Sequence, residues 1–374
     1  MNHSSIEGSM FIHSNISSGP PVQTSIINRF LEPDHGDNRE KLNIVYIKSH
    51  KTGGTTVSSI LNRFGYKRNL SFAMNSNKNW NGHLRELPLT RESPKDVLLP
   101  SLDGGDDWMN YRYNIMDIHV RYNRNVMDML MMGGTKYIAL LRDPVYQLES
   151  AFDFFGLAWE IRSLRKKPNA FQLFMTNPDK HMRWASKARR IDLRNNQFHM
   201  LGLENKFFND VPYIKTRVEE LDREFDLVMI LEHFDESLLL LKKLMNWEFE
   251  DILYIKKNQR LARSNINEDI SKKVRKWNAA DDILYKYFEE KLLARIQEYG
   301  ASFNSDLIEF QRMNEIVFDR CTGGDATKQH NNKIFEYNTK EDTDTYCNSF
   351  VYSFKDWVNI IWESQHLDDP TVES

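Results

Sequence analysis

The chain has 374 residues, of which 40% are hydrophobic and 28% charged, so we expect a large buried core and exclude gross disorder. Its 50 Lys and Arg against 53 Asp and Glu give a net charge of −3, which argues against a general nucleic-acid binder because such domains are strongly basic. The sequence contains no run of about 18 apolar residues and no apolar signal segment near its start, and therefore predicts no membrane span.

The chain divides into three parts by composition. Residues 1–41 are rich in Ser, Asn, Pro and His and lack periodicity, which predicts a disordered stem. We expect residues 42–317 to form the main domain and residues 318–374 a C-terminal extension packed on it.

Buried strands and helices alternate through the main domain. Apolar runs predict strands at 42–47, 136–141 and 225–231, and a short one at 115–120. A helix over 55–64 should end at Gly65, a second should run from Pro144 to about Phe155 with Asp143 as its cap, and a third should be capped by Asp235. Residues 267–315 read as mostly helical. This order predicts an α/β fold with a mainly parallel sheet flanked by helices.

The link between the first strand and its helix is typical of a phosphate-binding loop. A loop that opens a helix offers backbone N–H groups and the positive end of the helix dipole to an anion. The lysine precedes the glycines, so the loop is P-loop-like but does not match the nucleotide-triphosphate pattern GxxxxGK[ST]. The candidate anion-binding residues are Lys51, Thr52, Gly53, Gly54, Thr55 and Thr56.

A second anion-binding element follows the strand at 136–141. Arg142 stands directly after this strand, and Ser150 follows eight residues later on the next helix. Because parallel strands end at the same edge of a sheet, we expect both residues to lie near the loop and to hold a second phosphate.

These elements resemble the galactose-3-O-sulfotransferase family, a group of carbohydrate sulfotransferases whose donor is 3′-phosphoadenosine 5′-phosphosulfate (PAPS). The resemblance runs from about residue 42 to 350 and is carried by residues 47–56, 62–65, 141–144, 149–152, 232–238 and 247–254. Two departures stand out: vertebrate members tend to have Ala-Ser in place of Gly53-Gly54, and they are Golgi membrane proteins with an anchor that this chain lacks. We therefore expect a trimmed sequence or a soluble homologue.

The resemblance implies transfer of a sulfuryl group from PAPS to the 3-hydroxyl of a galactose on a glycolipid or glycan, and makes 42–317 the catalytic domain. Residues 51–56 would hold the 5′-phosphosulfate, and Arg142 and Ser150 the 3′-phosphate. Lys51 would stabilise charge that develops during transfer. The scheme requires no metal.

Two histidines compete as the base that takes the acceptor's proton. The segment around His119 is similar to the family's Asn-His-x-Arg-Phe segment, although Ile118 stands where the family has Asn, and this resemblance favours His119 as the base. His50 abuts the phosphate loop and is the alternative base, or contacts the donor. His83, Asp117 and Arg121 are further candidates for the acceptor site.

The resemblance also implies a compartment. A domain in the Golgi lumen would favour a disulfide between Cys321 and Cys347, which the residue count alone leaves open. It would also allow glycosylation at the Asn-x-Ser sequons of Asn2, Asn15 and Asn69.

Other functions remain open at this point. The nearest alternative is a sulfotransferase for another carbohydrate acceptor, such as a uronic-acid polymer. A nucleotide- or glycan-binding homologue without activity is a second, and a nucleotide kinase, disfavoured by the loop pattern, is a third.

Overall fold

A computed structural model describes residues 39–75, 98–102, 104–105, 107–186, 190–257, 259–260, 265–329, 334–341 and 343–366, all within one compact unit, Asn38–Ser374. The predicted stem, apart from residues 39–41, lies outside the described residues. So do Asn2, Asn15 and the acceptor-site candidate His83. Within the described residues, no helix is long and apolar enough to cross a membrane.

A parallel sheet forms the centre of the described structure, as the alternating pattern predicts. Its strand order is β2-β1-β3-β4, with β1 at Ile44–Ile47, β2 at Ile115–Met116, β3 at Lys136–Leu141 and β4 at Leu227–Ile230. Ile47 pairs with Ala139, and Leu141 pairs with Ile230. The main strands are confirmed, but β2 is far shorter than predicted, because the chain turns polar at Asp117 directly after two apolar residues.

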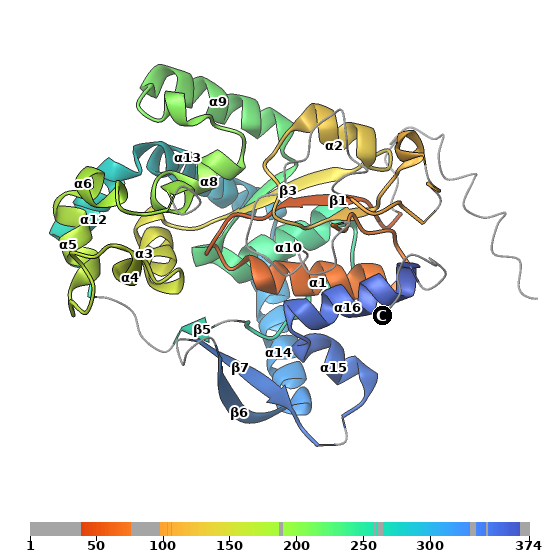
Figure 1. The fold of residues 1–374 in the computed structure, drawn as a ribbon. Coiled ribbons are helices and arrows are strands. Elements are labelled where there is room, and N and C mark those ends of the chain that lie inside the picture. Colours follow the sequence, from red (N-terminus) through yellow and green to blue (C-terminus); the bar gives the residue numbers. More distant parts are fainter. Residues whose placement is uncertain are drawn as a thin grey trace, which may run out of the picture. The chain divides into compact units, whose positions relative to one another are not determined.

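Helices cover both faces of this sheet (Figure 1). α1 (Gly54–Lys67), α10 (Phe234–Met245) and α16 (Phe354–His366) lie on one face, and α2 (Arg124–Leu130) and α9 (Val211–Glu224) on the other. The remaining shorter elements are α3 (Pro144–Phe154), α4 (Leu157–Glu160), α5 (Ala170–Thr176), α6 (Pro178–Met182), α8 (Asn196–Met200), α11 (Phe249–Ile252), α12 (Glu268–Trp277) and the 3-10 turns at Trp108–Asn110, Ile191–Leu193 (η5), Asn205–Phe207 and Leu231–His233.

One of the predicted helix ends is confirmed and two are wrong. Asp143 caps α3 by accepting a hydrogen bond from the Val145 amide over 2.8 Å. α1 continues past Gly65 to Lys67, and a side chain at Gly65 would meet Phe72 and Ile115. α10 begins at Phe234, so Asp235 lies in its first turn, where it accepts a hydrogen bond from the Tyr254 hydroxyl.

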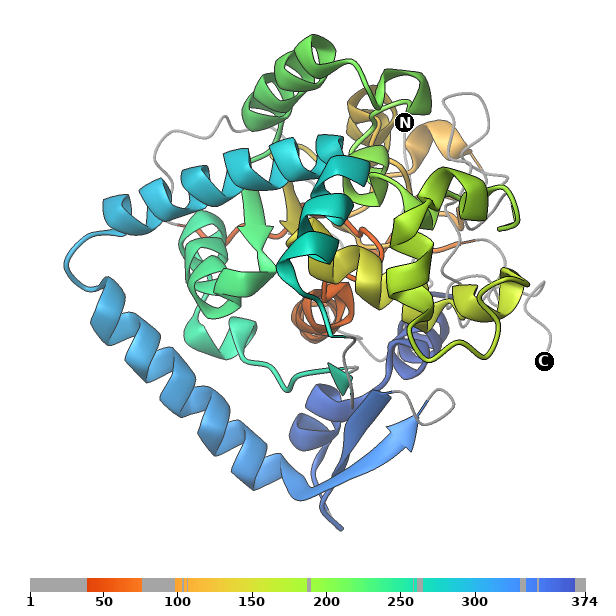
Figure 2. The same cartoon turned by 90° about the vertical axis from the view of Figure 1, so that its left-hand side faces the viewer.

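Two long helices, α13 (Ala279–Tyr299) and α14 (Phe303–Cys321), lead from the main domain to the last part of the chain (Figure 2). There, β6 (Thr322–Gln329) and β7 (Ile334–Thr339) pair with the short β5 (Gln259–Arg260) in an antiparallel sheet. The predicted boundary at residue 317 falls inside α14, so no linker separates the extension from the domain at that residue.

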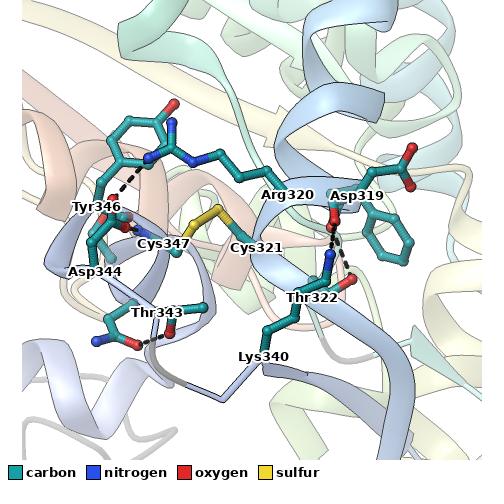
Figure 3. The surroundings of a disulfide bond; sticks show 12 residues. Asp319, Arg320, Cys321, Thr322, Lys340, Thr343, Asp344, Tyr346 and Cys347 are labelled. Carbon is teal, nitrogen blue, oxygen red and sulfur yellow. Dashed lines mark hydrogen bonds and ion pairs between the residues drawn. A yellow bond between two sulfur atoms is a disulfide. The ribbon is translucent and has the colours of Figure 1, made fainter.

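A disulfide joins Cys321, at the end of α14, to Cys347 in α15 (Thr345–Val351), as the resemblance implies (Figure 3). Next to it, Arg320 forms an ion pair with Asp344. The disulfide thus fixes the start of the C-terminal helices, of which α16 packs its buried Trp357 and Ile361 into the main core.

Candidate active site

The loop between β1 and α1 has the backbone geometry of an anion-binding turn. Gly53 precedes α1 with a φ of 91°, a left-handed conformation that favours glycine. Gly54 is required by space, since a Cβ there would lie 2.7 Å from the Tyr46 hydroxyl. The first amides of a 14-residue helix therefore lie behind the loop, where they can bind a phosphate.

The structure brings the two predicted anion-binding elements together. The Arg142 guanidinium donates a hydrogen bond to the Lys51 carbonyl oxygen over 3.1 Å. The Arg142 backbone is fixed in turn by Gln197, whose side-chain amide accepts from its N–H and donates to its carbonyl, each over 2.8 Å. Ser150 is buried on α3, the helix that follows Arg142.

The predicted hydroxyl residues of the loop differ in their roles. Thr52 is buried and donates to the Ser49 carbonyl, so its hydroxyl shapes the loop. The Thr56 hydroxyl accepts from the Lys257 amide over 3.3 Å, which ties the start of α1 to the segment after α11. Thr55 is half-buried. Lys51 places its ammonium 3.7 Å from the centre of the Phe154 ring.

His50 is held at every polar position but one. Its amide donates to Asn196 Oδ1 over 3.2 Å, and its carbonyl oxygen accepts from Gln147 Nε2 over 2.8 Å. Its Nδ1 bonds to the carboxylate of Asp192. The buried Nε2 has no hydrogen-bond partner among the described residues.

His119 lies against His50, with 4.7 Å between the ring centres. Its Nδ1 donates to the Lys48 carbonyl oxygen over 3.0 Å, which leaves the lone pair on Nε2. Burial, with the neighbouring charges of His50 and Lys48, lowers the pKa of His119 well below its ordinary value. The ring is therefore neutral near physiological pH.

Lys48 is a site residue that the sequence pattern did not single out. Its stem crosses the start of α1, where a Cβ on Gly54 would lie 3.1 Å from Lys48 Cγ. Burial lowers the pKa of Lys48 to about 8, partly offset by Asp117. Its ammonium lies 3.7 Å from the centre of the Phe354 ring, so the C-terminal segment covers this side of the loop.

The two remaining acceptor-site candidates, Asp117 and Arg121, differ in whether their polar groups are already bonded within the protein. Asp117 is buried near Lys48, its pKa is raised by burial, and its Oδ2 has no hydrogen-bond partner among the described residues. Arg121 donates to the carbonyl oxygens of His199 and Gly202, so its guanidinium supports the backbone.

The comparison with protein families decides the class. The sequence model of the galactose-3-O-sulfotransferase family matches residues 8–340. The chain belongs to this family. Mouse galactosylceramide sulfotransferase is 29% identical over 300 residues, which cover 77% of this chain and 66% of that protein. Bovine galactose-3-O-sulfotransferase 3 is 30% identical over 322 residues, covering 82% and 67%. The chain thus spans just under two thirds of the length of the mouse relative.

The geometry fits the donor of this family of sulfotransferases. Arg142 bonds to the backbone of Lys51 in the loop that precedes α1, so two cationic residues lie at a helix N-terminus, which suits a ligand with several phosphate-type groups. Two buried polar atoms on the loop itself, Ser49 Oγ and His50 Nε2, have no hydrogen-bond partner in the described part of the chain. Within the described residues, no group of three or more His, Cys, Asp or Glu side chains is arranged to hold a metal ion.

Proposed function

We propose that this protein transfers a sulfuryl group from PAPS to the 3-hydroxyl of a galactose residue on a glycolipid or glycan. The observation that carries the proposal is the contact between Arg142 and the loop at Lys51, because it unites two anion-binding elements on one sheet edge beside two histidines. Membership of the galactose-3-O-sulfotransferase family supports galactose as the acceptor sugar.

The loop residues would bind the donor. The amides at the start of α1 and the Lys51 ammonium face the 5′-phosphosulfate, while Arg142 and Ser150 hold the 3′-phosphate. As the sulfuryl group leaves, negative charge grows on the departing phosphate, and fixed cations stabilise it without reorganisation. Lys48, whose stem crosses the same helix end, adds a third positive charge.

A histidine would take the proton of the acceptor hydroxyl as its oxygen attacks sulfur in line with the departing phosphate. The sequence favours His119 and leaves His50 as the alternative. Both have Nδ1 bonded within the protein and Nε2 as the remaining ring nitrogen, which is the arrangement that a general base requires.

We place the domain in the Golgi lumen. The disulfide between Cys321 and Cys347 supports an oxidising compartment. The sequon residue Asn69 is exposed in the turn after α1, where an attached glycan would meet solvent.

A transfer assay tests the function. Purified protein is incubated with sulfur-labelled PAPS and four acceptors: galactosylceramide, a galactose-terminated oligosaccharide, a uronic-acid polymer and a glucose-terminated control. We expect label on the galactose acceptors, at the 3-hydroxyl by linkage analysis. Label on the uronic-acid polymer alone would establish the alternative acceptor. Binding of PAP, the product that remains when PAPS has lost its sulfuryl group, without transfer to any acceptor would indicate a binding protein.

A further inference from the structure

Asp192 is a buried carboxylate that the proposed reaction does not yet use. It lies in η5, between α6 and α8, and bonds to Nδ1 of His50, which is 142 residues earlier in the chain. Only 2% of Asp192 is exposed, and a carboxylate is costly to bury unless it is paired. The contact with His50 Nδ1 provides a partner for this buried carboxylate.

The contact fixes which ring nitrogen of His50 remains available. An ionised carboxylate only accepts hydrogen bonds, so Nδ1 carries the proton and the Nε2 lone pair is left. The amide and carbonyl of the same residue are held by Asn196 and Gln147, so neither the backbone nor the ring is free to turn. A buried Nε2 that has no partner in the part of the chain that the structure describes, on a ring held in this way, indicates a group available to a ligand.

The geometry around the two rings places a carboxylate against His50 and no carboxylate in the described contacts of His119. A proton on His119 is opposed by burial and by the charges of His50 and Lys48. A proton on His50 Nε2 is compensated across the ring by the Asp192 carboxylate, as in a base held by an acidic partner. The groups that contact the His50 ring are Asp192 from η5, His119 from the segment after β2 and Phe155 from the end of α3. Lys48 and Lys51 are the charged residues of its own loop.

We propose that Asp192 is a positioning residue that acts through His50, holding its ring so that Nε2 takes the proton of the acceptor hydroxyl. The proposal rests on the proposed sulfuryl transfer. In the step, the hydroxyl O–H bond breaks as the Nε2–H bond forms. The oxygen bonds to sulfur, and the bond from sulfur to the phosphate oxygen breaks with its electron pair leaving on PAP. The proton then passes from Nε2 to water.

Kinetics of Asp192→Asn separate this role from a structural one. We expect kcat to fall by about 10²- to 10⁴-fold, the usual contribution of a positioned base, while the affinity for PAP stays normal. In a His50→Ala background the same substitution should cause no further loss, because Asp192 acts only through that ring. Asp222→Asn on α9, which removes an ion pair with Lys291 of α13, is the matched control and should keep normal kcat.

Two results would overturn the proposal: normal kcat in Asp192→Asn, or losses of kcat that multiply in the double variant.

Should Asp192→Asn fail to fold, the wild-type protein still provides a test. Nitrogen NMR of labelled histidine, with the His50 signal assigned by its absence in His50→Gln, should show Nδ1 protonated and Nε2 bare. An Nε2-protonated ring contradicts the proposal. Wild-type protein that transfers no sulfuryl group would refute the proposed function, while the NMR measurement of His50 would still show whether Asp192 fixes the protonation of its ring.

Discussion

The Arg142 guanidinium bonds to the Lys51 carbonyl oxygen, although 91 residues separate the two in the chain. The contact arises because β1 and β3 are parallel neighbours, so that the residues after both strands share one edge. Arg142 thereby supports the loop and presents a cation beside it.

Removing either cation should weaken donor binding. Each of Lys51→Ala and Arg142→Ala loses one charge-assisted contact, and we expect PAP affinity to fall by about 1.5–3 kcal/mol in each variant. Isothermal calorimetry with PAP measures this. Lys272→Ala, on an exposed surface pair with Glu268, is the control. Unchanged affinity in both site variants would refute this assignment of the donor site.

The interior of α1 makes a prediction about stability. A Cβ at Gly65 would lie 2.5 Å from Ile115 Cδ1 and also too close to the Phe72 ring. Gly65→Ala should therefore destabilise the fold by about 1–3 kcal/mol through overpacking, despite the better helix propensity of alanine. Gly133→Ala, where no atom of the described residues lies within 4 Å of the added Cβ, is the matched control. Denaturant unfolding of both variants tests this, and equal stability would contradict it.

Strands and strand ends were the predictable part of this protein. β1, β4 and the part of β3 after Lys136 are apolar runs buried on both faces, and the residue types directly after β1 and β3 identify an anion site. Helix ends were less predictable. At Gly65, a residue that suits a cap instead allows α1 to pass close to Phe72, a contact that local sequence does not encode.

The supports of the site could not be predicted. Asp192 and Gln147 contact His50 from 142 and 97 residues away, and nothing in their own neighbourhoods marks them. Asn196 and Gln197 hold His50 and Arg142 in place, a role that follows only from the packing of α8 beside the loop.

The disulfide should contribute to the stability of the C-terminal part. Cys321 and Cys347 are 26 residues apart, and closing a loop of this order contributes roughly 3 kcal/mol in the chain-entropy account. Replacing both with serine should lower the free energy of unfolding by about that amount. Denaturant unfolding of the oxidised protein and the double variant gives the difference, and identical curves would refute the estimate. A reduced wild-type sample should behave like the variant.

The charge of Lys48 predicts a pH dependence of donor binding. Burial lowers the pKa of Lys48 to about 8, so its ammonium is present below that pH and is lost as the pH rises through it. An anion binds better to the charged form; PAP affinity should therefore be level below pH 8 and fall above it. Burial also lowers the pKa of Lys257, which donates to the Tyr352 carbonyl, to about 8.

Calorimetry across this pH range, on wild type, Lys48→Met and Lys257→Met, separates the two lysines. We expect Lys48→Met to remove most of the decline. A profile that keeps its full slope in Lys48→Met but loses it in Lys257→Met would place the titrating cation at Lys257. A flat wild-type profile would exclude both from the donor site.

The choice between the two histidines can be settled with a pair of variants. The sequence assigns the base to His119, and the carboxylate of Asp192 favours His50. A positioned base contributes about 10²- to 10⁴-fold, so the variant that lacks it should lose that much turnover while binding PAP normally. If Asp192 works as proposed, His50→Ala shows this loss and His119→Ala a smaller one, since the neutral His119 ring then only packs against the base. A larger loss of turnover in His119→Ala, together with weakened PAP binding in His50→Ala, would assign the base to His119 and make His50 a contact of the donor. Turnover with labelled PAPS and calorimetry with PAP, on both variants, distinguish these outcomes.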